Sequence, residues 1–584
     1  MTILEQPEDQ CSGVQVSGLA RCLAHLNSAE LGSFLRHLSP GAELDVRGTT
    51  LDPALLRHLK DALTPSGVRG ARTRVGHAQF NGTTFTGEAD FRDTTFAEDA
   101  DFSGATFAVA LFARSTFAGN VRFFLTSFTE GAGFVGTTFK QRADFTRATF
   151  SQRADFKGTT FTWSGRFTSA TFMGDVYFDS MLGAATTFAE DADFSGATFT
   201  SAASFCDTAF VQHARFSGAT FTNSKRLGPL TAGRLDLRGA QFGGAVVIEA
   251  EAGEVSCRGT RFAGGVELRI RRGRVDLADA FLGAVSSLAP SATKSTGCQA
   301  TDLEYVPAHR PVLTFLSGTD VSELALTDVD LHWCRFAGAH HLDKLRIEGD
   351  SPFPRQPRVW WRSSRQVLFD EHLWRARRAP RSGWLASDPR DSPEGRIEQV
   401  GPDRLAALYR SLRKALEDGK NEAGAGDFYF GEQEARRRAI NTSAVERGVL
   451  LTYWLASGYG QRASRAISAL IGLVAVVTIL LVSFGLAAPG PVSQSTTATR
   501  ATLGGGQETV TIVDDIPPKL PATGARWAWD RVDTSARIAL GAVVFRDTSQ
   551  KLTTAGTWTV MFARFAGPIL LTLAALAVRA RVKR

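Results

Sequence analysis

Phenylalanine recurs along the chain from Phe80 to Phe221, in steps that are almost all five or six residues long. A short fixed period over such a length indicates a stacked repeat architecture. An α-helix needs apolar residues at i, i+3, i+4 and i+7, and a flat strand needs strict alternation, so the spacing fits neither element. The intervening Gly, Thr, Ser, Asp and Ala are poor helix formers. The pattern therefore predicts a coil that turns a corner about every five residues and places one Phe inside at each face.

A small residue lies two positions before many of these Phe residues, as Ala100 does before Phe102. A large and a small side chain at this offset can share the interior of a narrow coil. Polar pairs such as Ser103-Gly104 suit the corners, and the extra residue of each six-residue step predicts a widened corner. Burial of one Phe contributes on the order of 2–3 kcal/mol. A continuous Phe ladder can therefore stabilise such a column, provided that its open ends are capped.

The unit A-D-F-S-G-A-T-F occurs at residues 100–107 and again at 192–199, within the longer string TTFAEDADFSGATF that is repeated unchanged. This unit resembles the pentapeptide repeat family, A-(D/N)-L-x-x, in a Phe-rich variant with eleven-residue double units. The resemblance implies a mainly β fold, a right-handed quadrilateral parallel β-helix with four faces per coil. It says almost nothing about function.

The repeat pattern loosens after Phe221 but continues with a period of twenty residues. Such a period corresponds to four faces of five residues, so we expect the β-helix to continue with aliphatic residues inside. The three echoing sets are Leu235, Leu237 and Phe242; then Val255, Cys257 and Phe262; then Val275, Leu277 and Phe281. Residues 285–310 are expected to interrupt the helix as a loop, and repeat-like spacing returns over 321–347.

The segment before the repeats predicts a helical cap over the first coil. Residues 31–38 and 53–63 have amphipathic spacing, and Asp52-Pro53 is a typical helix start. The first ten residues lack the basic start and apolar run of a secretory signal.

A basic connector rich in Pro, Arg and Trp follows over 351–400, with one helix expected around 365–377. A helical hairpin comes next. We expect Asp403 to cap its first helix, 405–417, and Gly419 to end that helix; Gly424-Ala425-Gly426 is expected to be a turn before a second helix over about 425–438. This string resembles the segment that joins pentapeptide repeats to membrane helices in bacterial membrane-bound members of the family.

Two segments are apolar enough to cross a membrane. Residues 466–488 carry no charge, and about twenty apolar residues span a bilayer. Residues 558–578 form the second span and include Arg564, either a snorkelling residue near the outer face or a buried functional charge. Basic residues flank both spans on one side, at 462–465 and 579–584, which predicts a multi-pass protein of the plasma or inner membrane with both termini in the cytoplasm.

These patterns divide the chain into the following segments: 1–74, an N-terminal helical cap; 75–222, the Phe-rich β-helix; 223–350, its degenerate continuation; 351–465, the basic connector and helical hairpin; 466–488, the first membrane helix; 489–556, an extracytoplasmic loop; 557–578, the second membrane helix; and 579–584, a basic cytoplasmic tail.

Charge is unevenly placed along the chain. The whole sequence carries a net charge of +7, but residues 78–221 hold 15 acidic against 10 basic residues, a net of −5. The positive excess lies in arginine clusters at 355–381 and 436–438. Such clusters suit nucleic acid, a solvated surface or anionic lipid. The two membrane spans favour the last two, so we expect no nucleic-acid partner.

The sequence contains no recognisable catalytic constellation. The cysteines form no C-x-x-C pair and have no His partner at metal-ligand spacing, so we expect them to be reduced and incidental. His340-His341 are expected to be exposed corner residues. Leu552–Thr557 (residues 552–557) faintly resemble the filter of two-span potassium channels, after an apolar segment at 536–545 that could dip into the bilayer. We therefore predict no catalytic, cofactor-binding or metal-binding residues and no enzyme activity.

The leading functional hypothesis is a membrane-anchored scaffold whose cytoplasmic β-helix binds a protein partner. One alternative is a degenerate two-span channel or transport-related subunit. A second alternative is a DNA-mimicking binder of a topoisomerase, an activity known in the pentapeptide repeat family, although a net charge of −5 is weak for that role. The sequence predicts neither the partner nor the oligomeric state.

Overall fold

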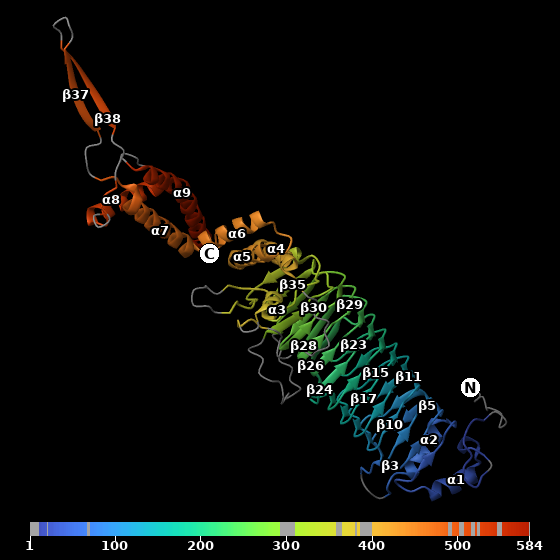
Figure 1. Cartoon of the computed structure of the whole chain (residues 1–584). Coiled ribbons are helices and arrows are strands. Elements are labelled where there is room, and N and C mark those ends of the chain that lie inside the picture. Colours follow the sequence, from blue (N-terminus) through green and yellow to red (C-terminus); the bar gives the residue numbers. More distant parts are fainter. Residues whose placement is uncertain are drawn as a thin grey trace. The chain divides into compact units, whose positions relative to one another are not determined.

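The structure is a computed structural model of the whole chain (Figure 1). It describes residues 11–19, 21–66, 70–291, 310–357, 365–379, 382–385, 400–488, 493–501, 507–515, 520–522, 526–545 and 552–582. The chain forms two compact units, Met1–Asn421 and Glu422–Arg584. The division falls inside the segment 351–465 that the sequence assigned to one connector and hairpin.

The first unit contains a β-solenoid of about 12 turns, built from short parallel strands. In Figure 1 these strands lie side by side along the column, from the blue end near α1 to the yellow end near α3 and α4. One sheet contains β1 (Leu44–Asp45), β3 (Thr73–Val75), β4 (Ala78–Gln79), β6 (Thr94–Phe96), β7 (Ala100–Asp101), β9 (Thr116–Phe117), β10 (Val121–Arg122), β12 (Thr138–Phe139), β13 (Ala143–Asp144), β16 (Thr160–Phe161), β17 (Gly165–Arg166), β20 (Thr187–Phe188), β21 (Ala192–Asp193), β24 (Thr208–Arg215), β26 (Arg226–Asp236), β28 (Val246–Ser256), β30 (Val266–Ile270), β31 (Gly273–Asp276), β33 (Ser286–Ala289), β34 (Pro311–Phe315), β35 (Leu324–Thr327) and β36 (Arg346–Glu348).

A second sheet forms other faces of the same solenoid. It contains β2 (Thr50–Leu51), β5 (Thr84–Asp90), β8 (Thr106–Leu111), β11 (Ser127–Gly133), β14 (Thr149–Phe150), β15 (Ala154–Asp155), β18 (Thr171–Phe172), β19 (Val176–Tyr177), β22 (Thr198–Phe199), β23 (Ala203–Ser204), β25 (Thr220–Phe221), β27 (Gln241–Phe242), β29 (Arg261–Phe262) and β32 (Phe281–Leu282). The predicted β-helix is confirmed.

Stacked aromatic rings fill the interior of the solenoid. Each Phe lies directly over the Phe one coil below, with ring centroids between 4.4 and 5.2 Å apart, which is close to the spacing of neighbouring strands. Phe102, for example, stacks on Phe80 at 4.7 Å and on Phe123 at 4.9 Å. The alanine two positions before it, Ala100, is also buried. The large-and-small interior pair expected from the sequence is therefore present.

A second set of inward residues was not foreseen. Where the residue two positions before a Phe is Thr or Ser, it is fully buried, and many of these hydroxyls donate to a main-chain carbonyl of the solenoid. Thr126 donates to Phe102 O at 2.8 Å, and Thr137 donates to Phe112 O at 2.7 Å. A buried hydroxyl is tolerated only when it is hydrogen-bonded, so these bonds explain how a polar residue replaces alanine at this position.

Half of the corners are tight turns that need a left-handed residue. At Phe80-Asn81-Gly82-Thr83 the Thr83 N–H donates to Phe80 O at 3.1 Å, and Gly82 has φ +65°. The equivalent positions are held elsewhere by glycine, by polar residues such as Arg114 at φ +58°, and in one turn by Leu125 at φ +55°.

The solenoid continues past Phe221 with aliphatic residues inside. Leu235, Val255 and Val275 pair in register on successive coils, as the twenty-residue period predicts. Two expectations were wrong. Leu282, not Phe281, stacks in register with Phe262; Phe281 points outward, with the Arg261 guanidinium 4.1 Å from its ring centroid. The expected loop at 285–310 begins with a strand, β33, and its residues 292–309 lie outside the described part of the chain.

The solenoid begins earlier than the expected boundary at residue 75. Strand β1 pairs with β4 and β2 pairs with β5, so the first coil starts at Leu44. Helices α1 (Ser28–His37) and α2 (Pro53–Ala62) match the two helices expected in this region. The side chain of Asp52 accepts from the Leu55 N–H at 2.7 Å, as the predicted helix start requires.

Two further helices complete the first unit. Helix α3 (Phe369–Arg378) lies inside the expected connector, and α4 (Pro402–Asp418) is the first helix of the expected hairpin. Gly419 ends α4 as predicted. Asp403 does not cap α4, because it lies inside the helix: α4 begins at Pro402 and the capping position is Gly401.

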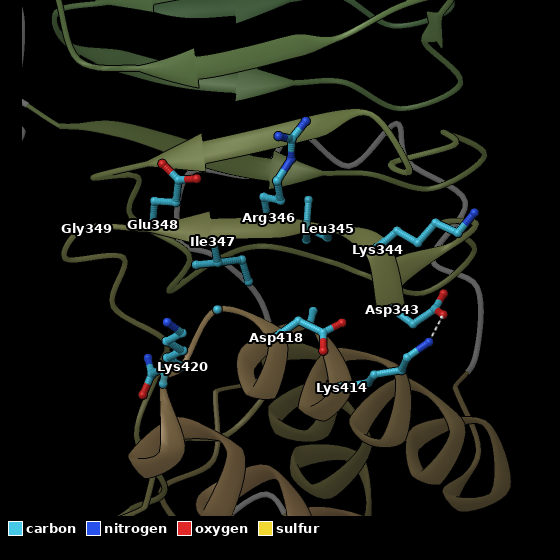
Figure 2. A pocket seen from close by; sticks show the side chains of 13 residues that line it. Asp343, Lys344, Leu345, Arg346, Ile347, Glu348, Gly349, Lys414, Asp418 and Lys420 are labelled. Atoms are coloured by element: carbon cyan, nitrogen blue, oxygen red, sulfur yellow. Dashed lines mark hydrogen bonds and ion pairs between the residues drawn. The ribbon is translucent and has the colours of Figure 1, made fainter.

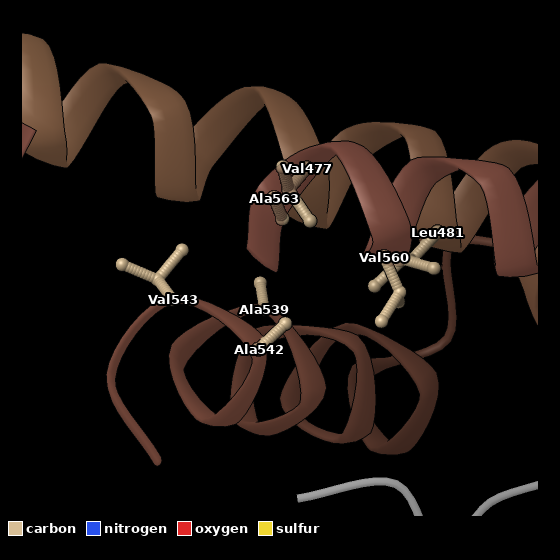
Figure 3. Close-up of a cluster of buried hydrophobic side chains, with 7 residues drawn as sticks. All are labelled: Val477, Leu481, Ala539, Ala542, Val543, Val560 and Ala563. Atoms are coloured by element: carbon tan, nitrogen blue, oxygen red, sulfur yellow. The ribbon is translucent and has the colours of Figure 1, made fainter. Parts of the chain in front are cut away.

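The second unit is mainly helical. It contains α5 (Glu422–Arg438), α6 (Ala444–Ser457), α7 (Ala463–Leu480) with a π-helical turn (Leu481–Gly485), the antiparallel hairpin β37 (Ser493–Ala501) and β38 (Gln507–Asp515), α8 (Trp529–Leu540) with a π-helical turn (Gly541–Phe545), and α9 (Thr554–Val582). Two helical stretches are long and apolar enough to cross a membrane: Ser464–Gly485 and Thr554–Arg579. Figure 3 shows the small apolar side chains, Ala563 among them, through which α7, α8 and α9 pack.

Candidate functional site

The outer surface of the solenoid carries a column of alternating charge. The column follows one register position up the first sheet and reads Asp101, Arg122, Asp144, Arg166, Asp193, Arg215 and Asp236. Neighbours in such a column lie about 4.8 Å apart, and Arg122 reaches Asp101 at 3.5 Å. Because positive and negative groups alternate, the column stabilises the stacking and has little net field. A DNA mimic needs a surface of one sign, so this arrangement weighs against the topoisomerase alternative.

Apolar side chains are exposed singly on the same solenoid. Trp163 is 56% exposed, Met173 is 50% exposed and Leu182 is 99% exposed. Leu182 lies where the Phe period pauses between Phe178 and Phe188, at a left-handed residue of a tight turn closed by a bridge between Met181 and Ala184. Leu182 is thus fully open to solvent at this turn.

A pocket lined by charged residues lies at the end of the solenoid. Figure 2 shows it between residues Asp343 to Gly349, which include β36, and the last turn of α4 with its following residues. Its volume is about 930 Å³. Four basic and three acidic side chains line it: Lys344, Arg346, Lys414 and Lys420, with Asp343, Glu348 and Asp418. Lys414 pairs with Asp343 at 2.9 Å. The described lining contains no Ser, Thr, Cys, Tyr or His, so its polar chemistry is that of ammonium, guanidinium, carboxylate and amide groups.

A buried ion cluster joins α3 to α4 beneath this end of the solenoid. Arg365 donates to both carboxylate oxygens of Glu371 at 2.8 Å, Arg375 donates to the same group, and the Tyr409 hydroxyl donates to it as well. Burial alone would raise the pKa of Glu371, but the two guanidinium groups lower that pKa to about 2. Tyr409 also accepts from the Leu368 N–H at 3.0 Å. The cluster is therefore a closed structural network with no open face for a substrate.

Asp370 closes the last coil. Its carboxylate accepts from the Phe336 N–H at 3.0 Å, a donor that has no further coil above it to pair with. Burial raises the pKa of Asp370 to about 6, although this hydrogen bond favours the charged form.

The arginine clusters are largely committed to pairs within the protein. Arg365 and Arg375 are buried in the cluster around Glu371, which corrects the expectation of a solvated face for that part of the chain. Arg437 and Arg438 both pair with Glu434 at 2.9 Å. Residues 358, 362 and 381 of the first cluster lie outside the described part of the chain. Arg355, Arg377 and Arg378 of the first cluster are exposed, so paired and solvent-facing arginines occur together in it.

The other residues singled out in the sequence do not come together in one site. His340 and His341 are exposed, as expected, and His341 pairs with Asp320 at 3.0 Å. Gly424-Ala425-Gly426 is not a turn, because it lies within α5.

The channel alternative depended on residues 536–557, and the structure does not support it. Residues 536–545 are helical and pack between α7 and α9. Thr554 to Thr557 form the first turn of α9, where the Thr557 N–H donates to Thr553 O at 2.9 Å. Helical carbonyls point along the helix axis, so this segment does not present the row of carbonyls that a filter needs. Arg564 is half-buried on α9.

One cluster was missed in the sequence. Cys11, Cys22 and His25 place a ligand atom each within 4.8 Å of one another. The expectation that no cysteine has a His at metal-ligand spacing was wrong, because Cys22 and His25 are separated by two residues, a common spacing of metal ligands. This Cys-x-x-His spacing is visible in the sequence, but no second cysteine lies close to it along the chain to mark a metal site.

These features define a repeat solenoid with a hydrocarbon interior, joined in sequence to two candidate membrane helices. Residues 80–127 and 134–181 match the family model for pentapeptide repeats (9 copies). The Phe-rich part of the solenoid is therefore built from pentapeptide repeats. Comparison of the chain with curated proteins and with solved structures returns no match.

Proposed function

We propose that this protein is a non-catalytic scaffold, anchored in the plasma or inner membrane by two helices, whose β-helix binds a protein partner on the cytoplasmic side. The observation that carries the proposal is the exposure of the two candidate spans. Only 17% of the apolar window of Ser464–Gly485 and 28% of that of Thr554–Arg579 is buried within the protein, with mean hydropathies of 2.7 and 1.8. The core helix of a soluble protein would be mostly buried, so this apolar surface needs a lipid environment.

The surroundings of the spans support the same assignment. An open groove of about 1000 Å³ runs between α6, α7 and α9 and is lined almost entirely by apolar residues, Val449 and Phe565 among them. Acyl chains would cover such a surface. Trp529 and Trp558, at the beginnings of α8 and α9, are 86% and 68% exposed, as expected for aromatic residues at the membrane–water interface.

The orientation follows from charge. Arg462 precedes α7 and Arg465 lies in its first turn, and basic residues also follow the apolar part of α9, so the positive-inside rule supports a cytoplasmic location for both termini. The β-helix, which precedes α7, is then cytoplasmic, and the segment between the spans is outside.

Topology reporters test the anchoring. Alkaline phosphatase fused after residue 522 should be active and fused after residue 584 inactive, while green fluorescent protein should show the opposite pattern. The protein should remain in the membrane pellet after alkaline carbonate extraction. Release by carbonate, or an active phosphatase at the C-terminus, would contradict the proposal.

Site-directed photocrosslinking tests the scaffold role. A photoreactive amino acid at Leu182 or Trp163, introduced in intact cells, should give one discrete adduct, because these side chains project from a rigid column. The control is the same residue at Lys140, also on the surface but without an exposed apolar side chain. Identical adducts at all three positions, or none at any, would count against a specific partner surface.

A further inference from the structure

The N-terminal end of the solenoid holds three soft metal ligands in one place. The Cys11 and Cys22 sulfurs are 3.1 Å apart, and the Cys22 sulfur is 3.1 Å from His25 Nδ1. Cys22 is buried, and the other two side chains are half-buried. Cys22 and His25 are neighbours in sequence, and the fold brings Cys11, eleven residues before Cys22, beside them.

The main chain around the cluster is tied to the first coil. The Val14 N–H donates to Arg47 O at 2.8 Å, and the Ser12 hydroxyl donates to Gly48 O at 2.9 Å. These carbonyls belong to the first coil, which has no earlier coil to pair with. The segment therefore covers part of the open edge that a solenoid must protect.

The same segment folds back on itself beside the cysteines. The Val16 N–H donates to Arg21 O at 3.0 Å, and Gln15 forms an antiparallel bridge with Cys22. A 3-10 turn, Leu23–His25, then carries the imidazole back toward the sulfurs. Gly13 permits the close approach, because a Cβ there would lie 2.8 Å from the Cβ of Cys22.

We propose that Cys11, Cys22 and His25 bind a Zn²⁺ ion that fastens the N-terminal segment over the first coil. Two thiolates and one imidazole form a ligand set typical of zinc, and a water molecule can complete the tetrahedron. With Zn–S bonds of about 2.3 Å, the two sulfurs of a tetrahedral site lie roughly 3.8 Å apart, so the sulfurs must separate slightly from their present 3.1 Å. Binding releases the proton of each thiol that is not already ionised.

A Cys11–Cys22 disulfide is the competing chemistry at this place. It requires the sulfurs to approach to about 2.05 Å and an oxidising compartment. It also gives His25 no role, whereas the metal site uses all three side chains. The two possibilities are exclusive, because a disulfide sulfur is not a thiolate ligand.

The decisive measurement is metal content in the full chain, purified in detergent with a mild reductant and without chelator. We expect about one zinc per chain by elemental analysis, the stoichiometry of a single tetrahedral site. Replacement of the zinc by Co²⁺ should give thiolate-to-cobalt charge-transfer absorption in the near ultraviolet. Cys22→Ser and His25→Gln should each lose the metal and this absorption. Cys206→Ser, which changes another half-buried thiol far along the solenoid, should keep both.

Hydrogen exchange separates loss of the metal from failure of a variant to fold, because it is measured on the unaltered protein. In the unaltered protein, removal of zinc by a chelator should speed amide exchange at Val14 and Val16 by at least tenfold and leave the coil around Phe145 unchanged. Metal-free protein with a Cys11–Cys22 disulfide found by peptide mass spectrometry would overturn the proposal. Retention of the metal in both the Cys22→Ser and the His25→Gln variants would also overturn it.

Discussion

Replacement of Phe145 by alanine tests the aromatic ladder at its centre. Phe145 is fully buried and stacks between Phe123 at 4.7 Å and Phe167 at 4.8 Å, with edge contacts to Phe134 and Phe156 at 5.5 and 5.6 Å. A buried Phe→Ala substitution costs about 3–5 kcal/mol. The upper part of that range applies here, because six aromatic neighbours lose a partner, the four above and Phe139 and Phe150 at 6.0 and 6.3 Å. Coils tied by main-chain hydrogen bonds also cannot collapse to fill the space.

The response of a solenoid to this loss is local. Each coil contacts only its neighbours, so the substitution should open the coils that contain Phe123, Phe145 and Phe167 before it unfolds the ends. A loss of about 3–5 kcal/mol corresponds to roughly two to three and a half orders of magnitude in the opening equilibrium. Hydrogen exchange with mass spectrometry, on the full chain in detergent, should show acceleration of this order in those coils and little change in the aliphatic coils around Leu235 and Val255.

Two variants control the comparison. Trp163→Ala removes a comparable aromatic side chain from the outside of the solenoid, where it is 56% exposed, and should leave exchange nearly unchanged. Phe145→Leu keeps most of the buried volume and should cost less than the alanine variant. If Phe145→Ala and Trp163→Ala accelerate exchange equally, or if the alanine variant changes nothing, the ladder is not what holds the coils together.

Three further perturbations follow from the same contacts. Charge reversal of Arg122, Arg166 and Arg215 to Glu places like charges opposite one another on successive coils, and it should lower the free energy of unfolding by about 0.2–1 kcal/mol per site, with partial recovery in salt. Thermal unfolding should show no such effect for Lys140→Glu, whose neighbours in register are uncharged. An equal loss in that variant would contradict the alternating column. Glu371→Gln leaves Arg365 and Arg375 buried without their carboxylate and should cost about 3–5 kcal/mol in denaturant unfolding, whereas Glu417→Gln, at the surface pair with Arg413, should cost under about 1 kcal/mol. The fold raises the pKa of Asp370 to about 6 from about 3.9 in the unfolded chain, so the contribution of Asp370 to stability is complete below pH ~4 and is lost as the pH rises through ~6. Asp370→Asn should remove this pH dependence of stability in melting curves taken across that range. A variant less stable than the parent at pH 7 would refute the raised pKa of Asp370.

The interior of the solenoid could be predicted from the sequence because every coil repeats the same environment. Phe102 and Ala100 meet the same neighbours as their counterparts one coil above and below, so one period specifies them all. The twenty-residue period after Phe221 predicted the inward aliphatic residues for the same reason. The expectation for Phe281 departed from this period, because Leu282 lies twenty residues after Phe262 and is its partner in register. One residue of register decides which of these two apolar side chains faces inward.

The buried hydroxyls and the ion cluster could not be predicted in this way. Thr126 looks polar in the sequence, and only the position of the Phe102 carbonyl makes its burial acceptable. Arg365 and Arg375 look like part of a solvated cluster, because their partner Glu371 is one acidic residue among many arginines and Tyr409 lies far along the chain. Composition describes the charge of a segment, but burial depends on which element covers it.

The non-repetitive chemistry of the first unit is concentrated at its two ends for a physical reason. Inside the column most interior positions have an apolar neighbour above and below, and a thiol there, such as Cys257, is fully buried and packs as a small apolar side chain. The first and last coils have neighbours on one side only and present unpaired main-chain groups. At the start, Val14 pairs the Arg47 carbonyl beside Cys22 and His25; at the finish, Asp370 pairs the Phe336 N–H beside Glu371. The residues on which we expect metal and pH to act, Cys22 and Asp370, therefore lie at these two ends.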